Sequence, residues 1–200
     1  MAVRIHRFDT AALATTPWKN GGGTTRELAC VPEGAGIEDF DWRVSIASID
    51  RAGPFSAFDG VDRVIMLLEG DGVRLHSGDG RIDHRLDRPH APFAFAGDVA
   101  LDCDLLGARS ADFNVMTRRG KLRADVRVLG NVDDIAPAAA GLLLALRGRW
   151  RLQGADAVVL EPGHGLWWTQ HDAGWHAMPA DVDAPALVAV RFETLSLTGP

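Results

Sequence analysis

The sequence predicts an all-β protein folded as a sandwich or a barrel. Short apolar or alternating segments recur along the 200 residues, and turns rich in Gly and Asp separate them, which is typical of all-β sandwiches and barrels. Residues 41–49 alternate most clearly, and residues 64–68 form an apolar run that suits a strand buried on both faces. A chain of this length can hold one large domain or two small ones.

Composition and charge exclude several classes of protein. The formal net charge is −6, and no basic run or aromatic-studded basic stripe offsets it, so we expect no nucleic-acid partner. The longest apolar runs are far shorter than the roughly 20 residues of a membrane span. The amino terminus lacks the charged, apolar and small-residue order of a signal peptide. We therefore predict a cytoplasmic protein without a membrane partner.

Taken in order, the first elements surround a glycine-rich segment. Residues 3–6 predict a short edge strand, and Asp9 offers an N-cap for one or two turns of helix through Ala14. Pro17 would end that helix. Residues 24–30 then predict a strand with Thr24, Arg26 and Leu28 on one face.

The alternating segment at residues 41–49 has two chemically different faces. Trp42, Val44 and Ile46 lie on one face, which we expect to pack between the sheets. Arg43 and Ser45 lie on the other face, which either meets solvent or lines a cavity. Turns follow at residues 53–55 and at Gly60. Further strands are then predicted at residues 64–68, 73–76, 81–86, 93–95, 100–106 and 113–116.

A faint internal repeat predicts two halves of shared architecture. Residues 64–70, followed by 73–75, resemble residues 142–148, followed by 150–152. In each pair an apolar strand runs into a glycine turn and a second alternating strand follows. Residues 91–95 and 165–168 are a weaker third pair. These similarities place a first half at residues 1–120 and a second half at residues 121–200, packed as one compact unit.

The second half begins with a connecting segment. Residues 121–140 are expected to form the crossover, with a capped short helix starting at residues 131–135 and ending or bending at Pro137. An apolar strand at residues 186–192 closes the fold.

The least generic segment is residues 17–28, where three consecutive glycines stand among donor side chains. Glycines allow backbone conformations that other residues resist and let N–H groups approach a ligand or another strand. The spacing does not match a phosphate P-loop or a Rossmann glycine pattern. Either the segment binds a small polar or anionic molecule, or its glycines make a turn and Lys19 and Arg26 are merely solvated.

Four blocks in the first half resemble the HutD/Ves family. They are Pro-Trp-Lys-Asn-Gly-Gly-Gly-Thr-Thr-Arg-Glu at 17–27, Phe-Asp-Trp-Arg-Val-Ser-Ile-Ala at 40–47, Gly-Pro-Phe-Ser-Ala-Phe-Asp-Gly-Val-Asp-Arg at 53–63 and Asp-Phe-Asn-Val-Met-Thr-Arg-Arg-Gly at 112–120. The resemblance implies a cupin-like jelly-roll barrel, a bicupin of two related halves, linked to bacterial histidine utilisation. It also favours a cavity on the Arg43 and Ser45 side of residues 41–49. The family's own molecular activity is poorly defined.

Metal and nucleophile motifs are missing from the sequence. No His-x-His element of metal cupins is present, and the cluster of His164, His171 and His176 lacks the spacing that puts three ligands on one strand face. Cys30 and Cys103 have no C-x-x-C spacing and are expected in the core. No Gly-x-Ser-x-Gly element occurs. We therefore expect neither a metal nor another cofactor.

The positive prediction is a site for a small anionic metabolite. Cations concentrate within the four blocks of a chain that is acidic overall, and guanidinium groups hold carboxylates through paired hydrogen bonds. The expected binding residues are Lys19, Asn20, Gly22, Thr24, Arg26, Arg43, Ser45, Ser56, Arg63 and Asn114. Aromatic residues Trp18, Trp42, Phe55 and Phe58 would form an apolar wall. Asp112 or Glu27 would instead balance an arginine if the charges were only structural.

Two functions remain open at this point. In the first, the protein binds a small carboxylate such as urocanate or a formylated or formiminated glutamate and modulates histidine catabolism. In the second, it is a metal-independent isomerase or hydrolase of a formyl or formimino intermediate, with Lys19, Glu27 or Asp112 as the acid or base. A structural role with a homodimer formed by the aromatic-rich second half is the third, weaker alternative.

Overall fold

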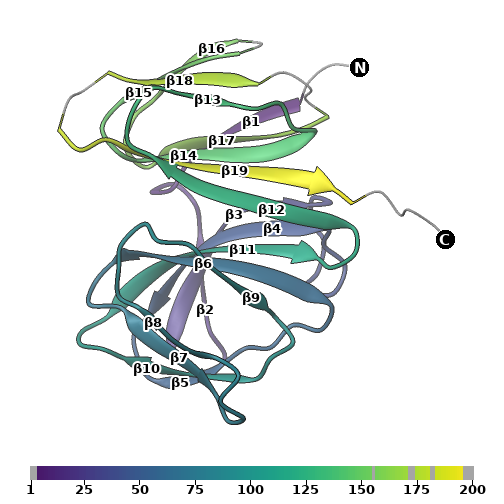
Figure 1. Cartoon of the computed structure of the whole chain (residues 1–200), viewed down its shortest axis with the longest axis vertical. Helices are drawn as coiled ribbons and strands as arrows, with labels where there is room; N and C mark the ends of the chain where they lie inside the picture. The colour runs from purple at the N-terminus through teal and green to yellow at the C-terminus, as the bar shows by residue number, and fades with distance from the viewer. Residues whose placement is uncertain (1–3, 155, 171–173, 181–182, 196–200) are drawn as a thin grey trace. The chain divides into compact units, whose positions relative to one another are not determined.

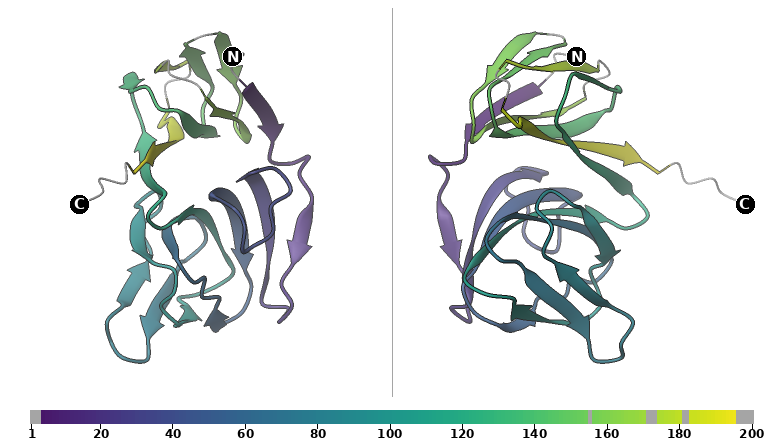
Figure 2. Two further views of the ribbon diagram at one scale, coloured as in Figure 1. Left: turned by 90° about the vertical axis from the view of Figure 1, so that its right-hand side faces the viewer. Right: turned by 60° about the vertical axis from the view of Figure 1, so that its left-hand side comes forward.

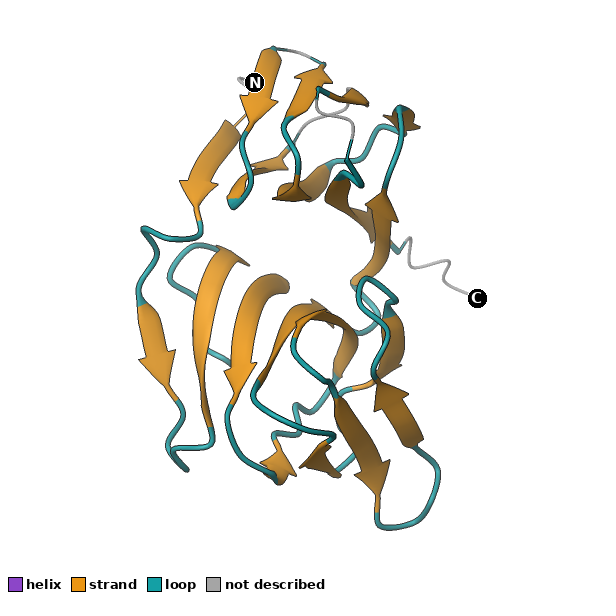
Figure 3. Ribbon diagram, turned by 90° about the vertical axis from the view of Figure 1, so that its left-hand side faces the viewer, coloured by secondary structure: helices purple, strands orange, loops and turns teal. Residues whose placement is uncertain are grey.

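The computed structural model describes residues 4–154, 156–170, 174–180 and 183–195, and within these ranges it contains strands and no helix (Figure 3). The described ranges therefore contain no helix with the length and apolar character of a membrane span. By its contacts the chain divides into two units: Ala14–Arg123 with Leu195–Pro200, the first unit, and Met1–Leu13 with Ala124–Thr194, the second unit. The all-β prediction is confirmed.

The first unit consists of two sheets that face each other. Its six-stranded sheet has the order β2-β3-β4-β11-β6-β9, and its four-stranded sheet has the order β5-β10-β7-β8 (Figure 1). The strands are β2 (Thr15–Pro17), β3 (Gly23–Val31), β4 (Trp42–Ile49), β5 (Gly53–Phe55), β6 (Val61–Glu69), β7 (Val73–Ser77), β8 (Asp83–Leu86), β9 (Phe93–Ala96), β10 (Leu101–Leu105) and β11 (Ser110–Arg118).

The second unit repeats this arrangement. Its sheets have the orders β1-β17-β14-β19-β12 and β13-β18-β15-β16, and Figure 2 shows their strands from two further sides. The strands are β1 (Arg4–Asp9), β12 (Leu122–Leu129), β13 (Asp133–Ile135), β14 (Ala140–Arg147), β15 (Trp150–Gln153), β16 (Ala157–Leu160), β17 (His164–Thr169), β18 (Trp175–Pro179) and β19 (Ala186–Thr194). Strand β1, at the amino terminus, pairs with β17 and so lies in this unit.

Strand order relates the two units element by element. The central run β4-β11-β6-β9 of the first unit corresponds to β12-β19-β14-β17 of the second, and β5-β10-β7-β8 corresponds to β13-β18-β15-β16. The three similarities seen in the sequence fall on corresponding strands: β6 with β14, β7 with β15, and β9 with β17.

Both predicted helices are wrong. At Asp9 the side chain accepts a hydrogen bond from the Ala11 N–H at 2.9 Å, as a cap does, but the structure there is a single turn that leads into β2. One turn fixes several dihedral angles for one hydrogen bond and does not propagate without more chain. Residues 131–135, expected as a helix start, include β13, whose backbone pairs with β18 and whose Ile135 is 1% exposed.

The expected crossover at residues 121–140 is also mostly strand. Strand β12 lies beside β19 at the edge of the five-stranded sheet of the second unit, and β13 follows it.

The apolar run at residues 64–68 lies in β6, where Ile65, Met66 and Leu67 are all essentially buried. This run is therefore buried on both faces, as its apolar pattern predicts.

Candidate functional site

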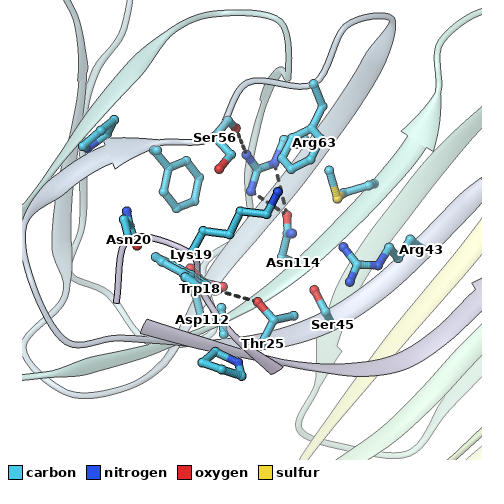
Figure 4. A pocket seen from close by; sticks show the side chains of 16 residues that line it. Trp18, Lys19, Asn20, Thr25, Arg43, Ser45, Ser56, Arg63, Asp112 and Asn114 are labelled. Atoms are coloured by element: carbon cyan, nitrogen blue, oxygen red, sulfur yellow. Dashed lines mark hydrogen bonds between the residues drawn. The ribbon is translucent and has the colours of Figure 1, made fainter. Parts of the chain in front are cut away.

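The first unit encloses a cavity of about 470 Å³ between its two sheets. Figure 4 shows the side chains that surround it. They come from the β2–β3 turn, strands β3, β4, β6 and β11, and the segment from β5 onwards: Pro17, Trp18, Lys19, Asn20, Thr25, Arg43, Ser45, Ala47, Pro54, Phe55, Ser56, Phe58, Arg63, Asp112, Asn114 and Met116. The volume lies within the range of sites for small molecules.

Cross-strand register arranges the side chains of the six-stranded sheet on the cavity side in three rows, and all of them except Glu27, Ile65 and Leu67 line the cavity. The rows across β3, β4, β11 and β6 are Arg43, Met116 and Arg63; then Glu27, Ser45, Asn114 and Ile65; then Thr25, Ala47, Asp112 and Leu67. Because successive rows are two residues apart on each strand, all these side chains point to the same face. The first row is called here the cationic end of the cavity, and the third row the Asp112 end.

Arg63 is the most deeply buried cation of the cavity, with 4% of the residue exposed. Its Nε and Nη2 donate to Asn114 Oδ1 at 3.3 Å each, and its Nη1 donates to the Ser56 carbonyl at 3.0 Å. Its guanidinium carbon lies 4.5 Å from the ring centre of Phe55. Burial lowers the pKa of Arg63 to about 10, while the charge of Asp112 acts in the opposite direction. The guanidinium therefore stays charged at neutral pH.

Asp112 is buried in the same cavity, with 2% of the residue exposed. Neither of its carboxyl oxygens has a hydrogen-bond partner among the described residues. Burial raises the pKa of Asp112 to about 7, and the charge of Arg63 only partly opposes this rise. A carboxyl group with such a pKa exchanges a proton near neutral pH, which is the property needed in a general acid or base.

Two further cations complete the cavity. The Lys19 side chain extends into it from the β2–β3 turn (Figure 4), and Nζ has no hydrogen bond or ion pair with any residue in the described ranges. Arg43 Nε donates to Glu27 Oε2 at 2.7 Å, and its side chain is 19% exposed. Only one of the guanidinium nitrogens is used in that pair, so the other two remain able to bind an anion.

The three glycines shape the β2–β3 turn and its contact with β4, and none of them is a lining residue of the cavity. Gly21 has a φ of +65° and closes the turn by donating to the Trp18 carbonyl at 2.9 Å. The Gly22 carbonyl accepts hydrogen bonds from the backbone of Asp50 and Arg51. A Cβ at Gly23 would stand 2.0 Å from the Ser48 carbonyl oxygen, so only glycine allows β3 to approach β4 this closely. The glycines thus hold the turn that carries Lys19.

Seven of the ten residues predicted for the site line this cavity: Lys19, Asn20, Arg43, Ser45, Ser56, Arg63 and Asn114. Gly22, Thr24 and Arg26 are not among the lining residues. Arg26 stands opposite Ile46, and Thr24 opposite Ser48, so both lie on the sheet face that points away from the Arg43 row. The expectation that Arg26 and Arg43 face one cavity is therefore wrong.

The Arg43 and Ser45 side of β4 lines the cavity, which is the alternative that the family resemblance favours, whereas the prediction that Trp42 and Val44 pack between the two sheets is wrong. Arg43, Ser45 and Ala47 face the interior between the sheets, while Trp42 and Val44 are buried on the opposite face at 2% and 0% exposure. Trp42 accordingly does not line the cavity, whereas Trp18, Phe55 and Phe58 do. Alternation indicates that two faces differ, but not which one points inward when both are buried.

Thr25, Asp112 and Met116 line the cavity although the binding prediction omits them. The period of two along residues 112–116 relates Asp112, Asn114 and Met116 as one face of a strand, so Asn114 in the predicted set could have indicated the other two. No sequence pattern indicates Thr25 in the same way, because the side of the sheet on which it lies depends on how β3 pairs with β4.

Three polar positions of the first unit's interior are apolar in the second unit. Both central strand pairs have a register shift, between Ala111 and Asp112 in one unit and between Ala145 and Arg147 in the other. Aligned on these shifts, the positions of Arg63, Asp112 and Asn114 are occupied by Gly141, Leu187 and Ala189. A Cβ at Gly141 would stand 2.4 Å from the ring of Trp168, and Trp150, Trp168 and Trp175 belong to the same buried cluster. The fold alone therefore does not require polar residues at these positions.

No thiol or imidazole group lines the cavity. Cys103, which belongs to the apolar cluster beside it, has a pKa raised to about 12, first by burial and then by the charges of Asp112 and Asp104. Burial likewise raises the pKa of Cys30. Both thiols are therefore poor nucleophiles at neutral pH. Within the described ranges no three His, Cys, Asp or Glu side chains are grouped as metal ligands, and His171 lies outside those ranges.

The site can thus bind an anion at three cations and exchange a proton at Asp112. The donors are arranged around an apolar wall of Trp18, Phe55 and Phe58, as in many small-molecule sites.

Comparison with known proteins identifies similar sequences over most of the chain. A family model described as HutD matches residues 10–187. Protein Ves from Cronobacter sakazakii is 41% identical over 164 residues, which cover 82% of this chain and 86% of that protein. Protein Ves from Citrobacter koseri is 43% identical over 146 residues, which cover 72% and 74% of the two chains.

Solved structures show the same similarity in three dimensions. A conserved protein of unknown function from Pseudomonas aeruginosa PAO1 has 28% identity and a TM-score of 0.86, covering 95% of this chain and 99% of that one. HutD from Pseudomonas fluorescens SBW25, in a formate condition, has 26% identity and a TM-score of 0.81, covering 96% and 100%. A Lactobacillus farciminis oxalate decarboxylase in complex with formate has 8% identity and a TM-score of 0.67, covering 97% and 90%. That last likeness shows a cupin-like fold alone.

Proposed function

Because this chain belongs to the HutD/Ves family, we propose that it binds a small carboxylate in the cavity of the first unit and thereby modulates histidine catabolism. The observation that carries the proposal is the convergence of Lys19, Arg43 and Arg63 on one cavity in a chain with a formal net charge of −6. Of the three, Arg43 has an ionic partner in Glu27, and Lys19 has none in the described ranges. A carboxylate would supply the missing countercharge.

The link to histidine catabolism comes from the family name, and urocanate and formylated or formiminated glutamate are the candidate ligands through that link. The chemical class of the ligand is argued from the three cations that line the cavity, and its identity only from the family link.

The bicupin architecture is part of the proposal. The matching strand orders of the two units support two jelly-roll halves of common origin. The ligand pocket then belongs to the half that corresponds to the first unit, and the half that corresponds to the second unit has a core that contains Trp150, Trp168 and Trp175. A cytoplasmic location and a homodimer are further predictions, and sedimentation at low concentration tests the dimer.

Thermal-shift measurements with the pathway's intermediates test the binding proposal. Ligand at a hundredfold excess over Kd should stabilise the native state by about 2.7 kcal/mol. Arg43→Met should weaken the binding roughly tenfold or more through loss of a charge-assisted contact. Arg26→Met is the matched control, because Arg26 lies on the opposite face of the same sheet and its replacement should leave affinity unchanged. No shift with any intermediate would count against the proposal.

A second function, metal-independent catalysis, is favoured by one observation, the pKa of about 7 at Asp112. Of the three acid–base candidates, Lys19 and Asp112 line the cavity, and Glu27 does not. Turnover of a formyl or formimino intermediate by the wild type that disappears in Asp112→Asn would support an isomerase or hydrolase. Binding without turnover would support the first proposal.

A further inference from the structure

The cavity is chemically different at its two ends. The cationic end carries Arg43 and Arg63, whereas the opposite row carries Asp112. The Arg63 guanidinium extends from its own row to Asn114 in the middle row, to which it donates, and its charge acts on Asp112. A ligand bound at the cationic end can therefore also reach Asp112, provided that it carries a second polar group.

Asp112 lacks a donor in the surrounding protein. Its carboxyl oxygens are unpartnered in the described ranges, although the group borders the cavity. At the same end, Trp18 Nε1 already donates to Thr25 Oγ1 at 2.7 Å. Arg63 donates to Asn114 and Ser56 and not to Asp112. A buried polar group without a partner is costly, so the missing donor is expected from whatever fills the cavity.

The second unit shows that the scaffold accepts an apolar residue here. Leu187 occupies the position equivalent to Asp112, as judged by strand register and the shared register shift. This type of sheet therefore does not require a carboxyl group at this position. In the first unit the charge of Asp112 acts on Arg63, but its oxygens accept no hydrogen bond in the described ranges. This unused acceptor capacity is explained if a ligand contacts it.

We propose that the ligand carries, besides its carboxylate, an N–H donor that binds Asp112, so that Asp112 selects nitrogen-bearing carboxylates over isosteric carboxylates without the donor. This inference rests on the proposed carboxylate site. The carboxylate lies at the cationic end, and the N–H group, from an amide, amine or imidazole, lies at the Asp112 end. Asp112 is thus a specificity-determining residue for this pocket.

Three cations share the cavity with Asp112: Arg63 on β6, Arg43 on β4 and Lys19 in the β2–β3 turn. Of these, Arg63 acts on the pKa of Asp112, and Asp112 in turn raises the pKa of Cys103 on β10. With pKa values of about 10 and about 12, Arg63 and Cys103 each keep one charge state between pH 6 and 8. The Asp112 carboxyl group loses its proton within that interval. Since an ionised carboxylate is the stronger acceptor, selectivity for the donor should increase with pH.

The experiment compares two compounds that differ only in the donor. The first is N-formylglutamate, and the second is its ester isostere, 2-(formyloxy)glutarate, in which oxygen replaces N–H. Neither the amide nor the ester titrates between pH 6 and 8. Calorimetric titration of the full chain at pH 6, 7 and 8 gives the ratio of their Kd values. Urocanate and 3-(2-furyl)acrylate form a second pair, with an imidazole donor, which is compared at pH 8 because an imidazole itself titrates toward pH 6.

We expect the amide to bind roughly tenfold or more tightly than the ester at pH 8, because a hydrogen bond to a charged group is involved. The ratio should shrink toward pH 6. In Asp112→Asn the ratio should be smaller and independent of pH, with Asp102→Asn, an exposed neighbour on β10, as the control that behaves like the wild type.

Equal affinities for both members of each pair at every pH would overturn the donor inference and leave the carboxylate site standing. Tighter binding of the donor-free analogues would overturn it as well. If no compound of either pair binds, both the inference and the proposed function fail. If Asp112→Asn does not fold, the ratio of Kd values measured with the wild type at the three pH values still tests the donor inference.

Discussion

Arg63 and Asp112 are opposite charges buried in one cavity, yet no hydrogen bond joins them. Removing a charge from water is expensive unless a partner and hydrogen bonds compensate. Arg63 has both, through Asn114, Ser56 and the aromatic ring of Phe55. Asp112 has neither hydrogen bond nor direct ion pair, and its raised pKa is the consequence.

Burial of the Asp112 carboxyl group predicts that the difference in unfolding free energy between the wild type and Asp112→Asn depends on pH. The native pKa of about 7 lies above the unfolded value near 3.8, so the native state binds an extra proton between these values. The wild type should therefore lose stability relative to Asp112→Asn as pH rises from about 4 to about 8, by an amount on the order of 4 kcal/mol. Above about pH 8 the difference should stay constant.

Urea unfolding at pH 4, 5.5, 7 and 8 measures this difference. Asp102→Asn serves as the control, because that side chain is exposed and pays no burial penalty. A stability difference between Asp112→Asn and the wild type that does not change over this pH range would contradict the assignment of Asp112 as a buried, uncompensated acid.

At the scale of elements, the β2–β3 hairpin positions the turn that carries Lys19 over the cavity. Its tip is held from outside the hairpin by Arg51, whose Nη2 donates to the Gly21 carbonyl at 2.6 Å. Directly after the turn, Gly23 at the start of β3 closely approaches the Ser48 carbonyl on β4, which holds the hairpin against that strand. The triple glycine therefore sets the position of Lys19, which lines the cavity.

Two neighbouring glycines should respond differently to substitution. Gly23→Ala places a methyl group against a backbone oxygen at 2.0 Å, so β3 must move away from β4. We expect a loss of roughly 2–3 kcal/mol, as in overpacked cores. Gly22→Ala meets only the end of the Asn20 side chain at 3.1 Å, which can move. Denaturant unfolding of both variants tests the contrast, and equal stabilities would refute it.

At the scale of the whole chain, two units share one strand order but have different interiors. The first contains a polar cavity, whereas the second contains a cluster with Trp150, Trp168 and Trp175. Strand β1 belongs to the second unit although it precedes the first in sequence. Its His6 ring stacks on Trp167, with centroids 3.8 Å apart.

Deletion of residues 1–9 should therefore destabilise the second unit rather than the cavity-bearing one. The deletion removes the edge strand beside β17 and uncovers apolar surface on its neighbour. Hydrogen exchange should show lost protection in β17 and β14, with β4, β6 and β11 retaining theirs. The substitution Arg7→Ala, at an exposed position on β1, is the control. Loss of protection confined to β4, β6 and β11 would contradict this prediction.

The sequence by itself determined the all-β class and the family. Both depend on local sequence patterns. These are short segments that alternate with a period of two between glycine turns, and four sequence blocks that occur in the same order as in the family. It also predicted Lys19, Arg43 and Arg63 as binding residues, since cations in an acidic chain stand out without knowledge of the fold, and all three line one cavity.

The tertiary structure alone decided which side chains meet. Arg26 and Arg43 look equivalent in sequence, but strand register sends them to opposite faces, and register is set by pairing between distant segments. Residues 133–135 form a strand because their backbone pairs with β18. A helix-capping pattern in the sequence carries no information about that pairing. The shifted pKa of Asp112 likewise arises from burial, which depends on packing around the carboxyl group and not on the identity of its chain neighbours.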